Sequence, residues 1–198
     1  MTRAILLSGG MDSIALSYWL RPQYAITIDY GQLPAEAEVR AASSVCGALA
    51  IKHQVINADL RSLGSGDLAG TSALSVSSVS EWWPYRNQML VTLAAMRCLS
   101  LGIQELIIGT INSDGFHRDG TPEFVKALDG LLSFQEGGLK LSAPAIGLSA
   151  AVLIQQSGVP DDILGWAHSC HRANFACGTC RGCEKHYLTL KELGRVAY

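Results

Sequence analysis

A glycine-rich turn and a group of cysteines are the two places where residue type and spacing suit chemistry. The turn spans Ser8–Ser13 (SGGMDS) and lies between apolar runs at 4–7 and 14–20. Backbone N–H groups in such a turn, together with the positive end of the helix that follows, form a ready anion site. Ser8 and Ser13 add hydroxyl donors. The expected ligand is a phosphate or pyrophosphate, although a bare Gly-Gly pair also occurs in ordinary strand–helix turns.

Four cysteines follow the spacing C-x6-C-x2-C-x2-C. They are Cys170, Cys177, Cys180 and Cys183. Four thiolates that converge on one tetrahedral ion are typical of a structural Zn²⁺ site, and an iron–sulfur cluster is the main alternative. Three flanking histidines, His168, His171 and His186, are expected to lie outside the ligand sphere because the cysteines already fill it.

Composition narrows the class of protein. The 198 residues are enough for one domain with a sizeable core, and 48% of them are hydrophobic. No apolar run approaches the length that spans a membrane. A formal net charge of −2 argues against a broad nucleic-acid-binding surface. No secretory signal is recognisable and the cysteines are clustered, so we expect a cytoplasmic protein, with Cys46 and Cys98 as inert core thiols.

The periodicity of apolar residues predicts the elements that position these groups. Strands are expected near 4–7, 25–28, 51–56, 105–108 and 139–142, and helices near 14–20, 34–49, 88–101, 122–134 and 149–156. This alternation predicts an α/β fold with a doubly wound, mostly parallel sheet and helices on both faces. We expect an α/β domain over 1–160 and a helical zinc-binding module over 161–198, packed as one compact unit.

Helix starts and one long loop carry further expectations. Asp12 or Ser13 is expected to cap the first helix, and Asn87 the helix that begins at Gln88. Residues 63–80 are rich in glycine and serine. A structureless stretch of this length is either a lid over the site or a mobile surface loop.

Polar residues also follow the later strands, where open α/β sheets bind ligands. Asp29–Gln32 follows the second strand, and Asp114 and Asp119 follow the fourth. Arg86 could neutralise the charge of a substrate or phosphate, and Asn87 could contact a base. The alternatives are a salt-bridged arginine, a plain helix cap and turn-forming aspartates.

Taken in chain order, these segments resemble the 7-cyano-7-deazaguanine synthase (preQ0 synthase) family of PP-loop ATP pyrophosphatases. The matching segments are Ser8–Ser13, Asp29–Gln32, Ser72–Leu74, Arg86-Asn87, Asp114, Asp119, Glu123-Phe124, Ala143-Pro144 and Ser169–Cys183. The resemblance covers almost the whole chain. It implies the fold called adenine nucleotide alpha hydrolase-like.

The resemblance also implies an activity. The family uses ATP to adenylate the carboxylate of 7-carboxy-7-deazaguanine and, with ammonia, converts it through the amide into 7-cyano-7-deazaguanine. The implied cofactors are ATP, Mg²⁺ and structural Zn²⁺. The expected partners are the deazapurine, ammonia or another amine, and a second copy of the chain in a homodimer. No membrane and no direct nucleic-acid binding are expected.

Site residues follow from the same resemblance. The expected catalytic residues are Ser8, Asp12, Ser13 and Arg86. The residues expected to bind ATP are Leu7, Ser8, Gly9, Gly10, Met11, Asp12, Ser13, Ile28, Asp29, Tyr30 and Gly109. Those expected to bind the deazapurine are Gln32, Arg86, Asn87, Asp114, Phe116 and Asp119. The zinc ligands are the four clustered cysteines.

The chain departs from the family pattern in two places. A family Tyr-Pro-Asp-Cys-Arg run is replaced by HRDGT at 117–121, and a Leu-Thr-Lys-x-Glu-Ile run by LSAAVL at 148–153. A lysine near the phosphates would stabilise transition-state charge, so its loss leaves two alternatives open. One is a homologue that joins the deazaguanine carboxylate to another amine, on a small molecule or a protein. The other is a nucleotide- or deazapurine-binding protein without turnover.

Overall fold

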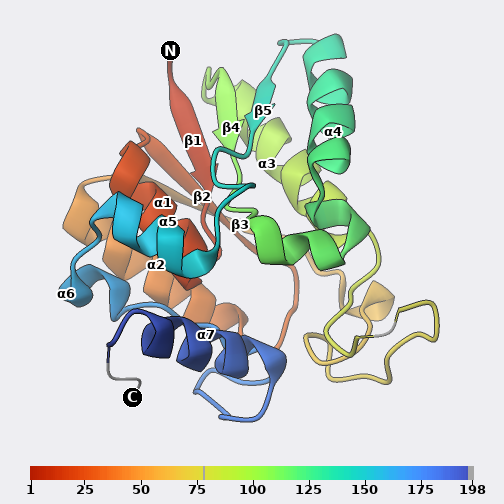
Figure 1. Ribbon diagram of the computed structural model, residues 1–198. Coiled ribbons are helices and arrows are strands. Elements are labelled where there is room, and N and C mark those ends of the chain that lie inside the picture. The colour runs from red at the N-terminus through yellow and green to blue at the C-terminus, as the bar shows by residue number, and fades with distance from the viewer. Residues whose placement is uncertain (78, 196–198) are drawn as a thin grey trace.

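The computed structural model describes residues 1–77 and 79–195, and the side chain of residue 116 lies outside its description. Within these ranges five strands form one sheet in the order β3-β2-β1-β4-β5, and every neighbouring pair is parallel (Figure 1). The strands are β1 (Arg3–Leu6), β2 (Tyr24–Asp29), β3 (Lys52–Asn57), β4 (Glu105–Ile107) and β5 (Lys140–Ser142). The sheet order places β1 at the centre. The chain adds β2 and β3 on one side and β4 and β5 on the other.

Helices connect the strands, and three short 3-10 turns interrupt the loops. The helices are α1 (Met11–Leu20), α2 (Ala35–Leu49), α3 (Arg86–Ser100), α4 (Pro122–Phe134), α5 (Ala150–Ser157), α6 (Asp161–Leu164) and α7 (Arg181–Glu192). The 3-10 turns are Arg61–Leu63, Asn112–Phe116 and Arg118–Gly120. The predicted α/β fold with a parallel, doubly wound sheet is confirmed. The strand order reverses between β1 and β4, which is where sheets of this kind bind ligands.

The prediction for the start of α1 is wrong. Gly10 is the N-cap, and no side chain caps the helix. Asp12 and Ser13 lie inside the first turn, where the Ser13 hydroxyl donates to the Gly10 carbonyl at 3.0 Å and the Asp12 carboxylate pairs with Lys185. Both side chains therefore have other partners, and the first N–H groups of α1 are left for a ligand.

The prediction for α3 is wrong as well. The helix begins at Arg86, and Tyr85 is the N-cap in the left-handed region, with φ of 53°. Asn87 lies in the first turn, and its side-chain amide donates to the Asp119 carbonyl at 3.0 Å. Since this contact crosses to a distant loop, no local sequence pattern could have indicated it.

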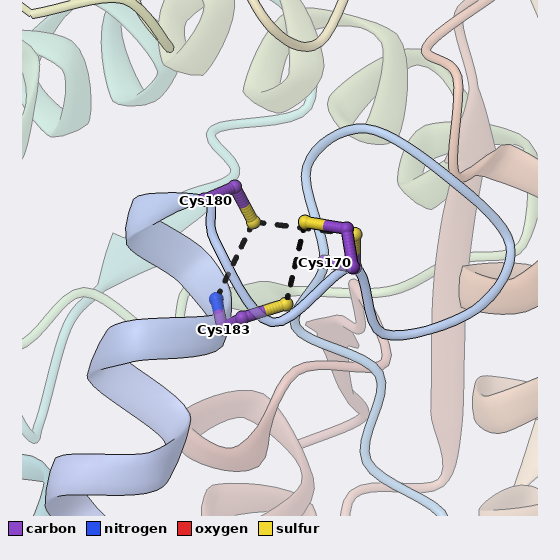
Figure 2. A group of neighbouring side chains, drawn as sticks. Cys170, Cys180 and Cys183 are labelled. Carbon is purple, nitrogen blue, oxygen red and sulfur yellow. Dashed lines mark hydrogen bonds between the residues drawn. The ribbon is translucent and has the colours of Figure 1, made fainter.

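The residues after α5 lie at the end of the sheet where the strands finish (Figure 1). We call residues 161–195 the C-terminal segment; it contains α6, α7 and, between them, an irregular stretch with Cys170, Cys177 and Cys180, while Cys183 lies in the first turn of α7 (Figure 2). Ile163, Leu164 and Leu190 pack into the same core as β1 and α1. A domain boundary near 160 remains a prediction.

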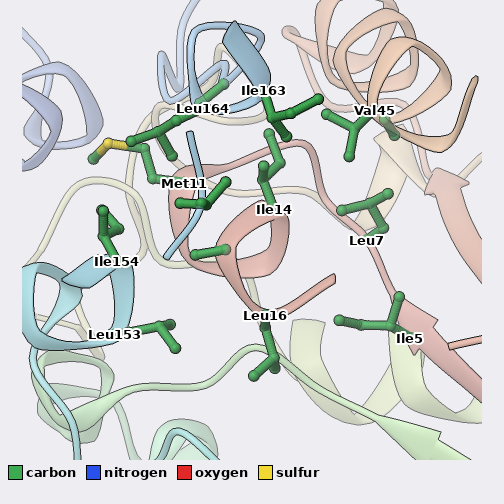
Figure 3. Packing of buried hydrophobic residues seen from close by; sticks show 14 of the residues in the cluster. Ile5, Leu7, Met11, Ile14, Leu16, Val45, Leu153, Ile154, Ile163 and Leu164 are labelled. Carbon is green, nitrogen blue, oxygen red and sulfur yellow. The ribbon is translucent and has the colours of Figure 1, made fainter. Parts of the chain in front are cut away.

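Two hydrophobic clusters cover the two faces of the sheet. On one face, Ile5 and Leu7 pack against α1 and α2, and α5 packs on the other side of α1 (Figure 3). On the other face, Ala4 and residues of β2 and β4 pack against α3 and α4. Cys46 lies in the first cluster and Cys98 in the second, and burial raises the pKa of each thiol to about 12. Both fit the expected core thiols.

Residues 64–85, which we call the long loop, contain no helix or strand at the positions that the structure describes. Leu68 and Trp83 nevertheless belong to the second core cluster, and Trp83 meets Tyr30 edge-on at 5.0 Å between ring centroids. The loop is thus anchored at two points, and whether it closes over a ligand stays a prediction. No helix in the described ranges is long and apolar enough to cross a membrane.

Candidate functional site

A cavity of about 310 Å³ opens at the carboxyl ends of the central strands. Its walls include Leu7 after β1, Ile28 at the end of β2, and Ile108 and Gly109 after β4. This is the position that the strand order predicts for a ligand. Gly109 approaches α1 so closely that a Cβ there would lie 3.3 Å from the Ser13 Cα, so the loop after β4 packs directly against the start of α1.

The glycine-rich loop, residues 8–13, forms one side of this cavity. Gly9 has φ of +79°, and a Cβ there would lie 2.7 Å from the Glu38 carbonyl oxygen, so a residue without a side chain is needed. The Ser8 and Ser13 hydroxyls are 3.2 Å apart, and the Gly10 N–H donates to Ser8 Oγ at 3.4 Å. No side chain caps the first N–H groups of α1, and the Ser8 and Ser13 hydroxyls lie in the loop beside them, an arrangement that suits phosphate binding.

Asp12 lies deep beside this loop. Its Oδ2 accepts a hydrogen bond from Lys185 Nζ at 2.9 Å, whereas its buried Oδ1 has no partner among the described residues. Burial raises the pKa of the Asp12 carboxyl, and the nearby Lys185 ammonium opposes this effect. A carboxylate oxygen without a partner, next to a phosphate site, is the kind of ligand that Mg²⁺ takes. Asp12 therefore fits a magnesium ion held together with phosphate oxygens.

A second group of charges lines the cavity near the end of β2. Burial disfavours the charge of Arg86, but Tyr30, Asp119 and Glu38 outweigh it and raise its pKa. Burial also raises the pKa of Glu38 to about 7, despite a hydrogen bond of 2.7 Å from Gln32 Nε2 and the charge of Arg86. The cavity thus contains a fixed cation and, in Glu38, a carboxyl that titrates near neutral pH.

The two predicted loop aspartates line the cavity, and both also have donors within the protein. Asp119 Oδ2 accepts from the Asn87 N–H at 3.3 Å. Asp114 Oδ2 accepts from the Ile111 N–H at 3.0 Å, and its Oδ1 accepts from Lys185 Nζ at 3.4 Å. Asp114 therefore forms a turn, as the alternative for these residues held, whereas the Asp119 carboxylate contacts the start of α3.

The cavity brings together most of the residues predicted from the sequence. Those that line it are Leu7, Ser8, Gly10, Met11, Asp12, Ser13, Ile28, Tyr30, Arg86, Asn87, Gly109, Asp114 and Asp119. Gly9, Asp29 and Gln32 do not line it; the Asp29 carboxylate accepts from the Gly31 N–H, and Gln32 bonds to Tyr30 and Glu38. The predicted side chain of Phe116 lies outside the described part. The roles assigned to these residues remain predictions.

Sequence reasoning missed several residues that line the cavity. They are Glu38, His117, His168, Ser169, His171, Gly182, Lys185 and His186. Two carboxylates raise the pKa of Lys185 against the effect of burial, so the side chain is a cation. The sequence contained one indication for Lys185. It follows Cys183 by two residues, so it had to lie close to the cysteine cluster.

The four predicted cysteine ligands converge. All four Sγ atoms lie within 4.8 Å of one another, with 3.9 Å between Cys177 and Cys183 and 4.0 Å between Cys170 and Cys180. Figure 2 shows the sulfurs of Cys170, Cys180 and Cys183 pointing toward one another. A disulfide needs about 2.05 Å, whereas tetrahedral zinc with Zn–S bonds of about 2.3 Å separates its sulfurs by about 3.8 Å. The donor set fits zinc.

Backbone donors support the same reading of the cluster. The N–H groups of His171 and Cys183 both point at Cys180 Sγ, at 3.4 Å each. The backbone of Thr179 holds the pKa of the Cys177 thiol down, to about 6. Such contacts stabilise thiolates, which are the form that binds a metal. His168 and His186 instead bond to the Ala173 carbonyl and the Ser169 hydroxyl, outside the ligand set.

The cysteine cluster also fixes one wall of the cavity. The His168 N–H donates to the Gly9 carbonyl at 2.9 Å, which ties the C-terminal segment to the glycine-rich loop. Gly182, in the first turn of α7, has no room for a Cβ because the Ser169 carbonyl lies against it. This close packing brings the start of α7, and with it Lys185, to the cavity.

Comparisons with known proteins agree with the geometry. The family described as "Queuosine biosynthesis protein QueC" matches residues 3–194. A 7-cyano-7-deazaguanine synthase from Desulforudis audaxviator is 30% identical over 99% of both chains. One from Xanthomonas axonopodis is 33% identical over 91% of this chain and 88% of its own. The solved structure of NMN synthetase from Francisella tularensis covers 100% of this chain and 79% of its own, with a TM-score of 0.53 and 17% identity, a likeness of fold alone.

Proposed function

Because this chain belongs to the family of queuosine biosynthesis protein QueC, we propose that it is an ATP-dependent C–N ligase that makes 7-cyano-7-deazaguanine from 7-carboxy-7-deazaguanine and ammonia. The names of its relatives support this product. The observation that carries the proposal is one cavity in which the glycine-rich loop and the half-buried Arg86 both form walls. One part suits a phosphate tail, and the other suits an anionic substrate.

The first half of the reaction makes a carboxylate reactive. A carboxylate oxygen is a poor leaving group, so an oxygen of the substrate attacks the α-phosphorus of ATP, and the bond to the β-phosphate breaks. The products are an acyl-adenylate and pyrophosphate. Charge grows on the departing pyrophosphate, and the first N–H groups of α1, with the Ser8 and Ser13 hydroxyls, would stabilise that charge. Ammonia then attacks the acyl carbon, and AMP leaves with the amide formed.

The second half removes the amide oxygen. The oxygen attacks the α-phosphorus of a second ATP, releases pyrophosphate and becomes an adenylate ester. Loss of AMP and a proton leaves the carbon–nitrogen triple bond of the nitrile. The same loop serves both activations, so two AMP and two pyrophosphate molecules are expected for each nitrile.

Side chains of this site position the reactants. Arg86 neutralises the substrate carboxylate or the α-phosphate, and the surrounding Tyr30, Asp119 and Glu38 keep its pKa high. Asn87, Asp114 and Asp119 line the wall that the deazapurine contacts. Magnesium, when bound, neutralises phosphate charge, and Asp12 would hold it. Zinc, when bound, crosslinks the C-terminal segment through its four cysteines.

Mass-resolved product analysis tests the proposal. With ATP, ammonia and 7-carboxy-7-deazaguanine, we expect the nitrile together with AMP and pyrophosphate. Arg86→Ala should lower product formation about 100-fold, because a buried charge-assisted contact is lost. Arg97→Ala, on the exposed side of the same helix, should leave it unchanged. Arg86→Lys retains the charge and separates loss of the contact from loss of the fold.

The replacement of Lys and Glu by alanine and valine at 150 and 152 favours a second candidate function. In it, the carboxylate is adenylated but joined to another amine, and the product is an amide. Formation of AMP without a nitrile, and only when a second amine is present, would support this candidate. ATP binding with no pyrophosphate release under any condition would instead indicate a binding protein. The expected homodimer is also a proposal, which analytical ultracentrifugation tests.

A further inference from the structure

Lys185 reaches the nucleotide site from a part of the chain that is remote in sequence. It lies in the second turn of α7, just after the cysteines, and its Nζ is 2.9 Å from Asp12 Oδ2 and 3.4 Å from Asp114 Oδ1. Asp12 is on α1 next to the glycine-rich loop, and Asp114 follows β4. The ammonium group therefore sits between the two loops that meet at the switch point of the sheet.

The balance of charge in the cavity indicates what this cation is for. Among the described residues that line the cavity, the arginine and lysine side chains are those of Arg86 and Lys185. The acidic side chains are those of Asp12, Glu38, Asp114 and Asp119. Arg86 interacts with Tyr30, Asp119 and Glu38 near the end of β2. A triphosphate brings several negative charges to the glycine-rich loop, beside the carboxylate of Asp12. Lys185 is the cation placed to offset them.

We propose that Lys185 binds the β- and γ-phosphates of ATP, and that Asp12 and Asp114 hold its ammonium group in place before the nucleotide arrives. The inference rests on the proposed use of ATP. A cation that is already held in place loses little conformational entropy when phosphate binds. The ammonium group of lysine is a compact point charge of the kind that binds phosphate. Asp12 Oδ1, which has no partner among the described residues, stays available for a magnesium ion.

This assignment gives the cysteine cluster a part in nucleotide binding. Cys180 is the N-cap of α7, and its sulfur accepts from the Cys183 N–H at 3.4 Å. The metal site thus sets where α7 begins and how it is rotated, and Lys185 lies two residues beyond the last ligand.

The competing reading is that Lys185 only neutralises two carboxylates and stabilises the fold. Ligands with and without phosphates separate the two readings. A phosphate contact affects ATP and inorganic pyrophosphate but not adenosine. A general disturbance of the cavity weakens all three.

Calorimetric titration of the full chain, with its metal retained, tests the proposal. Lys185→Ala should weaken binding of ATP and pyrophosphate about 10- to 100-fold and leave adenosine binding unchanged. Lys185→Arg should stay within a few-fold of the wild type, because the charge remains. Lys191→Ala is the matched control, since Lys191 is exposed in the last turn of the same helix. Zinc content and thermal unfolding check that each variant is folded. If Lys185→Ala does not fold, Lys185→Gln is used in its place.

The outcomes are distinct. The assignment of Lys185 is overturned if the wild-type protein binds ATP and the Lys185 variants bind it equally well. It is also overturned if the variants lose affinity for adenosine as much as for ATP. In both cases the proposed function stands. If the wild type binds neither ATP nor pyrophosphate, the proposed function fails, and the role of Lys185 fails with it.

Discussion

Arg172 donates from one guanidinium nitrogen to both carboxylate oxygens of Asp67, at 3.0 Å and 3.1 Å, across 105 residues of chain. A second ion pair links the same two parts of the chain, with 2.7 Å between Arg181 Nη1 and Glu81 Oε1. Both pairs join the long loop to the C-terminal segment. The cysteine cluster therefore supports the loop as well as α7, and the loop is held near the cavity without any helix or strand of its own.

The two ion pairs should contribute about equally to stability. The Arg172 and Arg181 side chains are 46% and 43% exposed, and their partners Asp67 and Glu81 are 14% and 8% exposed. Arg172→Ala and Arg181→Ala should each cost about 1 kcal/mol of unfolding free energy, because each leaves a largely buried carboxylate without its arginine while water screens the exposed guanidinium. Urea denaturation measures both. Arg61→Ala, in an exposed pair with Asp59, should cost almost nothing, and equal losses for all three would refute this ranking.

The glycine-rich loop should tolerate alanine at one glycine and not at the other. A Cβ at Gly9 meets the Glu38 carbonyl at 2.7 Å and forces a left-handed backbone on alanine, so Gly9→Ala should lose about 2 kcal/mol or more. A Cβ at Gly10 has 3.6 Å to its nearest neighbour, Ser8 Oγ, and φ there is −79°. Gly10→Ala should therefore fold with wild-type stability. Thermal unfolding checks the pair, and a stable Gly9→Ala protein would show that the loop differs from this structure.

Glu38 should make stability fall as pH rises toward neutrality. Its pKa is raised from 4.5 to about 7, so the folded protein retains a proton that the unfolded chain loses. Unfolding is favoured progressively as the pH passes from about 4.5 to about 7, by roughly 3 kcal/mol in all. Below that window the residue is protonated in both states and has no effect.

Glu38→Gln should remove this dependence while keeping an acceptor for the Gln32 amide. The difference in unfolding free energy between wild type and variant should grow between pH 5 and about 7.5. Glu123→Gln, the same change at an exposed position of α4, is the control and should show no such trend. Parallel pH profiles for wild type and Glu38→Gln would contradict the raised pKa.

Metal removal should unfold the C-terminal segment and disturb the site. Strong chelation, or Cys180→Ser, should speed hydrogen exchange in residues after about Asp161, because the irregular stretch with the cysteines has little apolar surface of its own. ATP affinity should fall at the same time, since Lys185 loses its support. Cys46→Ala, at a buried thiol outside the cluster, should retain the metal.

Elemental analysis of the purified protein distinguishes zinc from the iron–sulfur alternative, and visible absorption gives a second measure. One zinc per chain is the expected result. Slow exchange after Asp161 in a protein shown to be free of metal would overturn the structural role of the cluster.

Local signals in the sequence were enough to determine much of this protein. The spacing of Cys170, Cys177, Cys180 and Cys183 predicted a cluster of four thiols that could hold a metal ion, because all four lie within one short stretch. The alternation of apolar runs and helical patterns determined the parallel α/β sheet, and Ser8–Ser13 marked the turn after its first strand. Each of these depends on neighbours only a few residues away, so the sequence displays them directly.

Only the tertiary structure decided which residues complete the site. Lys185 meets Asp12 across 173 residues, and Glu38 lies behind Gly9 because α2 packs against the glycine-rich loop. The caps predicted for Asp12 and Asn87 were wrong for the same reason, since Lys185 and Asp119 engage those side chains instead. Contacts of this kind depend on how whole helices pack on the sheet and on the geometry of the metal cluster, and no local pattern of residues records that packing.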